Sequence, residues 1–319
     1  MSGGIDPGCI RIRLAIQDER VSAVALASDR PQLARALRGR PADAAVRLIP
    51  LMFALCGKAQ GRAAELALAA ARGQAMAAAL EPGIATEAMR EHLWRWLLDL
   101  PLLLDMAPMK EEFTAAIGWL ARDQRELIAK LLDDLRIGEL EARLDQLADC
   151  DEVAVALLPP MVADASLAAW PRLDADFCRQ PQWQGQAAET GALARRGAAP
   201  GGACARRWRA RLAELRDWAS GRAKVGAGGT ASSTQLAPGI GRALVETARG
   251  LLMHEIVLDG DTVADYFIVA PTEWNFHPQG PLVGWLLGRD ASQREALRSL
   301  VARCVAALDP CVRWELEGL

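Results

Sequence analysis

The stretch from Gly57 to Leu80, GKAQGRAAELALAAARGQAMAAAL, constrains the fold most, because it is long, rich in alanine and free of proline. Alanine has the highest intrinsic helix propensity, whereas a proline inside such a run would end or kink the helix. The stretch also follows directly on the apolar run VRLIPLMFALC. We therefore predict that it forms a buried helix.

Two parts of the chain alternate in the manner of β-hairpins. Residues 10–28, IRIRLAIQDERVSAVALAS, contain two alternating runs separated by QDER. A period of two is typical of strands with one buried face. Further along, LLMHEIVLDG and ADYFIVAP are joined by DGDT, which indicates a second hairpin.

Four further segments are predicted to be helical, and the two longest carry acidic and basic residues three or four positions apart. The segments predicted to be helical are 86–104, 110–148, 205–220 and 291–307. Glycine-rich loops are expected near 197–203 and 224–241. We predict a mainly α protein with small β-hairpin elements, of the α+β class. Its length allows one large domain or two ordinary ones.

Composition excludes several classes of protein. With 319 residues, 51% of them hydrophobic, the chain can bury a large core. A formal net charge of −3 gives no electrostatic footprint for nucleic acid. The most apolar stretches are broken before they reach about 18 residues, and MSGGIDPGCIRIR has no apolar signal-peptide core. We expect a cytoplasmic protein with no nucleic-acid and no membrane partner.

The cysteines follow no framework pattern. There are seven, their spacing is irregular and no C-x-x-C occurs, which argues against a disulfide scaffold and a zinc ribbon. Cys311 lies in the segment LDPC close to the C-terminus, where chains usually fray. Two thiols brought together by the fold could hold a soft metal or a preformed metal fragment.

Four segments draw attention as possible sites: FALCGKAQ, ETARGLLMH, VAPTEWNFHPQGP and LDPCV. Each has a simpler explanation when it is taken alone. A lone cysteine in an apolar run is usually a small buried hydrophobe. Arg249 would be an ion-pair or surface arginine, His254 a hydrogen-bonded core histidine and Thr272 a turn residue. No single segment identifies a function.

Taken together and in this order, the segments resemble the large subunit of nickel–iron hydrogenases. IRIRLAIQ…VSAVALAS is similar to their opening hairpin, and RALRGRPADAAVRLIPLMFALCGKAQ to the stretch leading into their R-x-C-G-x-C-x-x-x-H motif. ETARGLLMH and PTEWN resemble E-x-P-R-G-x-x-x-H and P-[ST]-x-W-N, and LDPC resembles the start of D-P-C-x-x-C-x-x-H. The resemblance implies a hydrogenase large-subunit fold, with residues 1–319 forming a single domain. Residues 105–240 fall largely outside it, and their role stays open.

The sequence departs from those motifs at the ligands that bridge nickel and iron. Ala59 and Trp314 stand at the two bridging cysteine positions, and Ala63 and Glu317 stand at the two histidine positions. Ala248 also replaces the proline before the motif arginine. The loss of both bridging ligands and both supporting histidines should greatly reduce the affinity for a binuclear metal centre. We therefore expect no nickel and no working hydrogenase.

This combination resembles the HupK/HoxV family of hydrogenase maturation proteins, which look like shortened large subunits. The resemblance implies a non-enzymatic scaffold that transiently holds the Fe(CN)2(CO) fragment. It also implies two kinds of partner: maturation factors that deliver the fragment, and an apo hydrogenase large subunit that receives it. In the implied site, Cys56 and Cys311 provide thiolate ligands to the iron. Arg249 and Thr272 donate hydrogen bonds to the two cyanides, and Glu246 and His254 support them.

Two alternatives remain open. The protein could be a metal-free chaperone that mimics the large subunit in order to recruit maturation factors, with Cys56 and Cys311 as relics. It could also be an enzyme acting on cyanide or thiocarboxamide groups, although no nucleophile–base pair stands out around either thiol. The carrier hypothesis requires the two thiols to converge in space.

Overall fold

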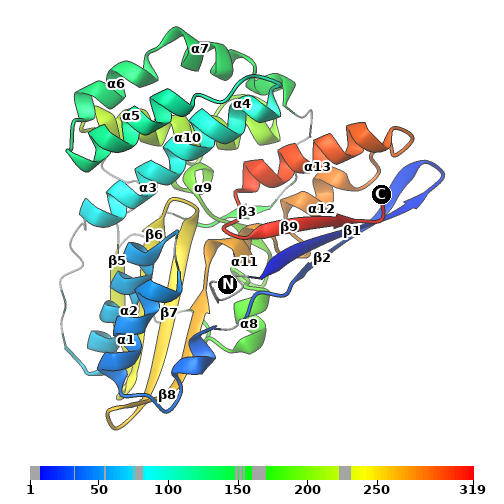
Figure 1. Ribbon diagram of the computed structural model, residues 1–319. Helices are drawn as coiled ribbons and strands as arrows, with labels where there is room; N and C mark the ends of the chain where they lie inside the picture. The colour runs from blue at the N-terminus through cyan, green and yellow to red at the C-terminus, as the bar shows by residue number, and fades with distance from the viewer. Residues whose placement is uncertain are drawn as a thin grey trace, which may run out of the picture.

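The computed structural model describes residues 8–31, 33–53, 55–74, 76, 82–147, 150, 153, 155–159, 170–222 and 231–319. Figure 1 shows a helical layer, a four-stranded sheet covered by helices and a smaller sheet that contains both ends of the described chain. Helices predominate and the strands are confined to small sheets. The predicted α+β class is confirmed.

The four-stranded sheet is antiparallel, in the order β5-β6-β7-β8. Its strands are β5 (Ala231–Ala237), β6 (Ile240–Thr247), β7 (Gly250–Asp259) and β8 (Thr262–Val269). The hairpin predicted in this region is confirmed as β7–β8. The loop predicted over 224–241 is wrong from residue 231 onward, because those residues pair as β5 and the start of β6; residues 224–230 lie outside the described residues.

The predicted alanine-rich helix covers this sheet. Helices α1 (Ala42–Met52) and α2 (Gly57–Ala71) lie side by side against it (Figure 1). The alanine face of α2 is fully buried and comes very close to β6: a Cβ atom added to Gly241 would lie 2.0 Å from the carbonyl oxygen of Ala67. Small side chains on both elements therefore allow the helix to lie directly on the sheet. The helix ends at Ala71 and not at the predicted Leu80; residues 75 and 77–80 of the predicted helix lie outside the described residues.

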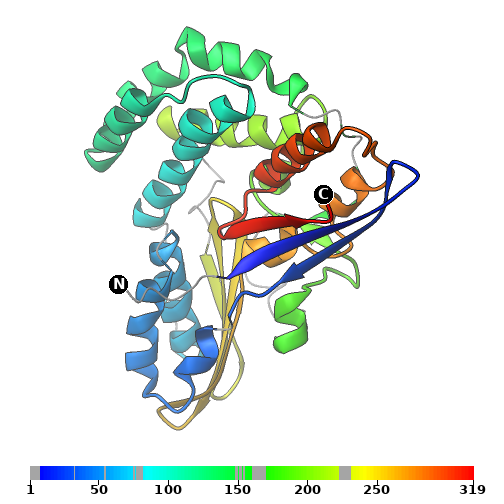
Figure 2. The ribbon, with the colours of Figure 1, turned by 45° about the vertical axis from the view of Figure 1, so that its right-hand side comes forward.

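The smaller sheet joins the two ends of the described chain. It contains β1 (Cys9–Gln17), β2 (Arg20–Ser28) and β9 (Arg313–Glu317), in the order β2-β1-β9. The predicted hairpin over 10–28 is confirmed as β1–β2. Strand β9 runs parallel to β1, with Ile10 opposite Trp314, and Figure 2 shows the two strands side by side. The C-terminal segment is thus held in a sheet rather than frayed.

The helical layer forms around a core that contains the edge-to-face pair Trp96 and Trp208. Its elements are α3 (Pro82–Trp94), the π-helical turn η2 (Arg95–Asp99), α4 (Leu100–Leu103), α5 (Lys110–Ala121), α6 (Arg125–Leu132), α7 (Leu135–Ala142), the 3-10 turn η3 (Leu144–Gln146) and α10 (Ala203–Ala219). The predicted helical segments 86–104 and 110–148 are confirmed, the second as three separate α-helices. Helix α10 is longer than the short helix predicted over 205–220.

The remaining elements lie between and beside these layers. They are the 3-10 turn η1 (Leu33–Leu37), the parallel pair β3 (Ala156–Leu157) and β4 (Ala188–Glu189), and the helices α8 (Ala175–Arg179), α9 (Ala192–Arg196), α11 (Pro271–Asn275), α12 (Pro281–Leu286) and α13 (Arg294–Leu308). Helix α13 confirms the predicted last helix. The described residues contain no helix with both the length and the apolar character that a membrane crossing requires.

Candidate functional site

Cys56 lies at the N-terminus of α2, where the backbone makes a tight approach. It is the residue preceding the helix, and the next position has to be small because a Cβ on Gly57 would lie 2.9 Å from the carbonyl oxygen of Pro50. The carboxylate of Glu87, from α3, accepts hydrogen bonds from the backbone N–H groups of Lys58 (2.8 Å) and Ala59 (3.3 Å). These contacts satisfy free donors of the first turn and fix the position of the thiol.

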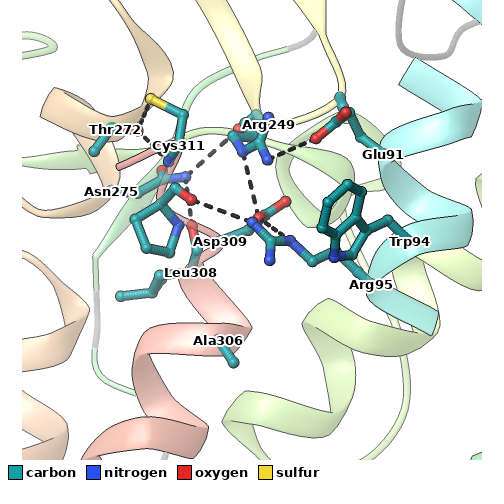
Figure 3. Close-up of polar contacts among 12 residues, drawn as sticks. Glu91, Trp94, Arg95, Arg249, Thr272, Asn275, Ala306, Leu308, Asp309 and Cys311 are labelled. Carbon is teal, nitrogen blue, oxygen red and sulfur yellow. Dashed lines mark hydrogen bonds and ion pairs between the residues drawn. The ribbon is translucent and has the colours of Figure 1, made fainter. Parts of the chain in front are cut away.

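Cys311 is held between the end of α13 and the start of β9. Its Sγ lies 3.1 Å from Oγ1 of Thr272, and its backbone N–H donates to the same oxygen at 3.3 Å (Figure 3). The preceding Asp309 has a left-handed φ of 54° and ends the helix. The turn, the threonine and the strand together fix the position of this half-buried thiol.

Both thiols line one cavity of about 200 Å³. Its walls are mostly apolar, with four polar side chains among them: Arg30, Gln60, Thr247 and Arg249. Burial, together with the nearby Cys311, raises the pKa of the Cys56 thiol to about 12. The Cys56 thiol is therefore protonated at neutral pH when the cavity is empty. The two predicted thiols therefore line the same cavity.

Arg249 reaches the cavity from the tight turn between β6 and β7. Its Nη2 donates to Glu91 at 2.9 Å, and its Nε forms an ion pair with Asp309 at 3.3 Å (Figure 3). Burial alone would lower the pKa of Arg249, but Asp309 and Glu91 outweigh it and raise that pKa. Asp309 also accepts a hydrogen bond from Arg95 at 2.6 Å. The guanidinium is thus charged and locked in one orientation.

Thr272 and Asn275 of α11 tie the turn of Arg249 to the C-terminal segment. The side-chain amide of Asn275 donates to the backbone carbonyls of Leu308 (3.3 Å) and Arg249 (3.5 Å), and its oxygen accepts from the N–H of Thr190 (2.9 Å). The hydroxyl of Thr272 contacts Cys311 as described. The P-[ST]-x-W-N segment therefore positions both the arginine and the second thiol.

His254 acts on the cavity through a chain of hydrogen bonds. Its Nδ1 lies 2.9 Å from the hydroxyl of Tyr266, and its Nε2 lies 2.9 Å from Oε1 of Gln60. Nε2 of Gln60 in turn lies 3.7 Å from Sγ of Cys56. With Nε2 of the histidine protonated, every donor in the chain has an acceptor, and the amide N–H of Gln60 points at the thiol. His254 thus orients Gln60 and does not line the cavity itself.

The buried histidine predicts a pH-dependent stability. Burial lowers the pKa of His254 to about 3, below the ordinary value near 6.5 that applies in the unfolded chain. The unfolded state therefore binds more protons between these values, and stability should fall as pH drops below about 6.5, by up to about 1.4 kcal/mol per pH unit. Denaturant unfolding of wild type and His254→Gln at pH 7.5, 6.5, 5.5 and 4.5 should show a shallower slope for the variant.

Tyr266→Phe is the matched control, because it removes the hydrogen bond to His254 but leaves the titrating ring in place. This variant should lose stability at every pH and keep the wild-type slope. Identical slopes for wild type and His254→Gln would show that His254 does not titrate on unfolding.

Glu246 supports the arginine turn from further away. Its carboxylate pairs with Arg195 at 2.9 Å and is not among the residues that line the cavity. Arg195 also donates to the backbone carbonyls of Thr247 (2.9 Å) and Ala248 (3.2 Å), which belong to the turn that carries Arg249. The glutamate thus acts through a buried guanidinium on the backbone of the turn.

The structure adds residues that the sequence motifs do not mark. Arg30 lines the cavity and forms an ion pair with Glu273 at 2.5 Å. Gln60 stands four positions after Cys56, a helical spacing that could have identified it. Asp309 belongs to the recognised LDPC segment, so its pairing with Arg249 could have been anticipated. Arg30 precedes a proline in a loop, and no pattern in the sequence marks it.

The comparisons with known proteins can now be set beside this geometry. No protein-family model matches the chain. The hydrogenase expression/formation protein HoxV of Cupriavidus necator is 36% identical, covering 92% of this chain and 92% of its own length. The hydrogenase expression/formation protein HupK of Azotobacter vinelandii is 33% identical, covering 97% and 98%. The chain belongs to the HoxV/HupK family of hydrogenase expression/formation proteins.

Solved structures agree with this assignment at the level of fold. The nickel–iron–selenium hydrogenase of D. vulgaris Hildenborough matches with a TM-score of 0.57 and 15% identity, over 93% of this chain and 94% of that chain. The reduced, active hydrogenase of Desulfomicrobium baculatum matches with a TM-score of 0.57 and 14% identity, over 93% and 95%. The HoxV/HupK chain therefore has a hydrogenase large-subunit fold, as its motif order predicted.

In this HoxV/HupK chain, the positions of the missing hydrogenase ligands take part in packing. Ala59 and Ala63 are fully buried on the face of α2 that meets the sheet. Trp314 packs against the core between the small sheet and α13, and Glu317 pairs with Arg13 of β1 at 2.7 Å. Small alanines allow the close helix–sheet approach, and the other two residues hold β9 in place.

Proposed function

We propose that this HoxV/HupK protein is a maturation scaffold that holds the Fe(CN)2(CO) fragment on Cys56 and Cys311 and then passes it to an apo hydrogenase large subunit. The observation that carries the proposal is that two thiols from distant parts of the chain line one cavity together with two guanidiniums. Thiolates are soft ligands suited to such iron centres. On this proposal the protein is a carrier and not an enzyme.

The cavity suits both kinds of diatomic ligand. Two thiolates and two cyanides concentrate negative charge at the iron, and the guanidiniums of Arg30 and Arg249 lie in the same cavity wall. Cyanide nitrogens accept charge-assisted hydrogen bonds from such groups. Thr272 offers a hydroxyl beside the Cys311 sulfur, 3.1 Å away. The apolar part of the wall, which includes Leu252 and Val312, suits the uncharged carbonyl ligand.

The proton state of the cavity favours transfer. Without iron, the Cys56 thiol is protonated, because burial raises its pKa to about 12. Iron binding therefore has to displace that proton. Reprotonation of the thiol therefore helps release. Two protein ligands also hold the metal less firmly than the four thiolates of a hydrogenase motif. We accordingly expect no nickel at Cys56 and Cys311.

The proposal includes partners and a place of action. The fragment has to come from maturation factors that build it, and the large-subunit fold gives those factors a surface like that of the final acceptor. The relatives are named expression/formation proteins, which agrees with a role before the hydrogenase is complete. We place this exchange in the cytoplasm.

Infrared spectroscopy tests the carrier directly. The protein is purified anaerobically from cells with intact maturation machinery, and the cyanide and carbonyl stretching bands are recorded. We expect the bands in wild type and their complete loss in Cys56→Ala and in Cys311→Ala, because each variant removes one of two metal ligands. Cys178→Ala is the matched control, since this buried thiol packs in a separate core cluster, and its bands should equal those of wild type.

Two results would overturn the carrier. One is the persistence of the bands in both ligand variants, which would place any iron elsewhere. The other is their absence from wild type while both variants still support hydrogenase maturation in cells. That second result would identify the metal-free chaperone instead.

A further inference from the structure

A second group of thiols converges away from the cavity. Cys150 follows the helical layer, Cys204 lies in the first turn of α10 and Cys304 lies on α13. Their Sγ atoms all lie within 4.8 Å of one another, and those of Cys150 and Cys304 are 3.6 Å apart. All three are buried, with exposed fractions of 2%, 0% and 0%. None of them lines the cavity of Cys56 and Cys311.

The surroundings of this group are apolar. The three cysteines belong to one core cluster with residues such as Leu282, Val301 and Val305. A single buried cysteine behaves as a small hydrophobe and needs no partner. Three sulfurs that point at one another from three separate segments are a different arrangement, because thiols pack no better together than apart. Convergence of this kind is what metal coordination requires.

We propose that Cys150, Cys204 and Cys304 bind one soft, thiophilic metal ion as thiolates. Metal–sulfur bonds of about 2.3 Å place two sulfurs on one ion at most about 4.6 Å apart, and about 3.8 Å apart at a tetrahedral angle. The Cys150 and Cys304 sulfurs are 3.6 Å apart and the other pairs no more than 4.8 Å apart, so metal binding needs only small sulfur movements. Thiolates that bind different irons of a cluster stand further apart, which favours a single ion. This proposal does not rest on the proposed function.

The three cysteines would bind as thiolates, so the incoming metal ion displaces their protons. The guanidiniums of Arg289 and Arg207 bring positive charge to the group.

Helix α10 adds its N-terminus to this environment. Cys204 is in the first turn of this 17-residue helix, which carries no acidic residue there, and helix N-termini stabilise anions. The N–H of Ala203 donates to the backbone carbonyl of Cys150 at 3.3 Å, so the loop that carries one ligand also caps the helix that carries another. An ion at this point would join α10 to α13, whose end leads into Cys311.

The ligand set narrows the choice of ion. Within the described part of the chain, no other histidine, cysteine, aspartate or glutamate donor completes the group. Three thiolates alone suit Cu⁺, whereas Zn²⁺ would add a fourth ligand such as water. Both ions bind converging thiolates, and metal titration and X-ray absorption distinguish them.

The test uses the full chain in a Cys56→Ser/Cys311→Ser background, so that the cavity contributes no thiolate. The anaerobic, metal-stripped protein is titrated with Co²⁺ as the probe, and separate samples receive Zn²⁺ or Cu⁺. We expect one Co²⁺ per chain with an intense sulfur-to-cobalt charge-transfer band, displaced by Zn²⁺, by Cu⁺ or by both. Adding Cys204→Ala or Cys304→Ala should abolish the band, and adding Cys178→Ala should leave it unchanged.

A second measurement decides the matter even where a core variant fails to fold. X-ray absorption of the Zn²⁺-loaded or Cu⁺-loaded background chain should show three sulfur neighbours at about 2.3 Å. A titration without a charge-transfer band, a band that survives in folded Cys204→Ala and Cys304→Ala, or fewer than three sulfur neighbours would overturn the site.

Discussion

Replacing Asp309 by asparagine should lower the free energy of unfolding by roughly 3–5 kcal/mol, the usual cost of breaking a buried ion pair from one side. The carboxylate is 2% exposed and pairs with Arg95 at 2.6 Å and Arg249 at 3.3 Å. Asparagine keeps the shape and tolerates the left-handed φ of 54°, so the variant isolates the charge. The buried guanidinium of Arg249 and the partly buried guanidinium of Arg95 would then lose their shared counter-charge. Urea or guanidinium unfolding at pH 7 measures the loss.

Asp145→Asn provides the matched control for this prediction. Its side chain is 58% exposed and pairs with Arg209 at 2.9 Å, and exposed pairs of this kind contribute about 0–1 kcal/mol.

The effect of the Asp309 substitution on stability should also depend on pH. Its neighbours hold the pKa of Asp309 below its ordinary value, so its contribution is complete above about pH 4 and declines as pH falls further. Equal losses for both variants, or a gap that widens in acid, would contradict the assignment.

Replacing Gly250 by alanine should cost about 2–5 kcal/mol, because strain and overpacking add. This residue follows Arg249 in the turn and has a φ of 127°. An added Cβ would lie 2.4 Å from the side chain of Thr190 and 2.7 Å from the backbone nitrogen of Gly191. The backbone contact cannot be relieved by rotating a side chain. The turn has to move, and Arg249 moves with it.

Gly260→Ala is the control for that change. Gly260 has a φ of 58° in the turn between β7 and β8, and an added Cβ would meet nothing within 4 Å. Only the conformational cost of about 1–2 kcal/mol remains. Thermal unfolding should therefore separate the two variants clearly, and on the carrier proposal only Gly250→Ala should also weaken the infrared bands of the bound fragment. Similar melting temperatures would show that the turn is looser than its contacts indicate.

The elements that were predicted correctly are those whose pattern is local. The alternation of residues 10–28 and the alanine-rich run after Gly57 each contain enough information within a few turns or pairs. The missed strands lack such a pattern. Nearly every residue of β6 is buried, so its sequence shows no alternation between buried and exposed positions. Strand β9 exists because of its pairing with β1 at the other end of the chain, which no local window can reveal.

The site residues also divide into those that a sequence motif marks and those that only the tertiary structure brings together. The resemblance to hydrogenase motifs marked Cys56, Cys311 and Arg249, and the structure brings these three to one cavity. Arg30 reaches that cavity through tertiary structure alone. The irregular spacing of the cysteines, which argued against a zinc ribbon, gave no sign that Cys150, Cys204 and Cys304 converge. Metal-ligand spacing rules apply to contiguous motifs, and these thiols come from three separate segments.

The parallel pairing of β9 with β1 has a consequence for the order in which the molecule is made. Cys56 leaves the ribosome early, whereas Cys311 and the strand that follows it are translated after nearly all other described residues. Domains form from the N-terminal side during synthesis, but this cavity needs walls from both sides. A nascent chain therefore has no compartment for a metal fragment. On the carrier proposal, the fragment can therefore be loaded only onto chains translated through Val312.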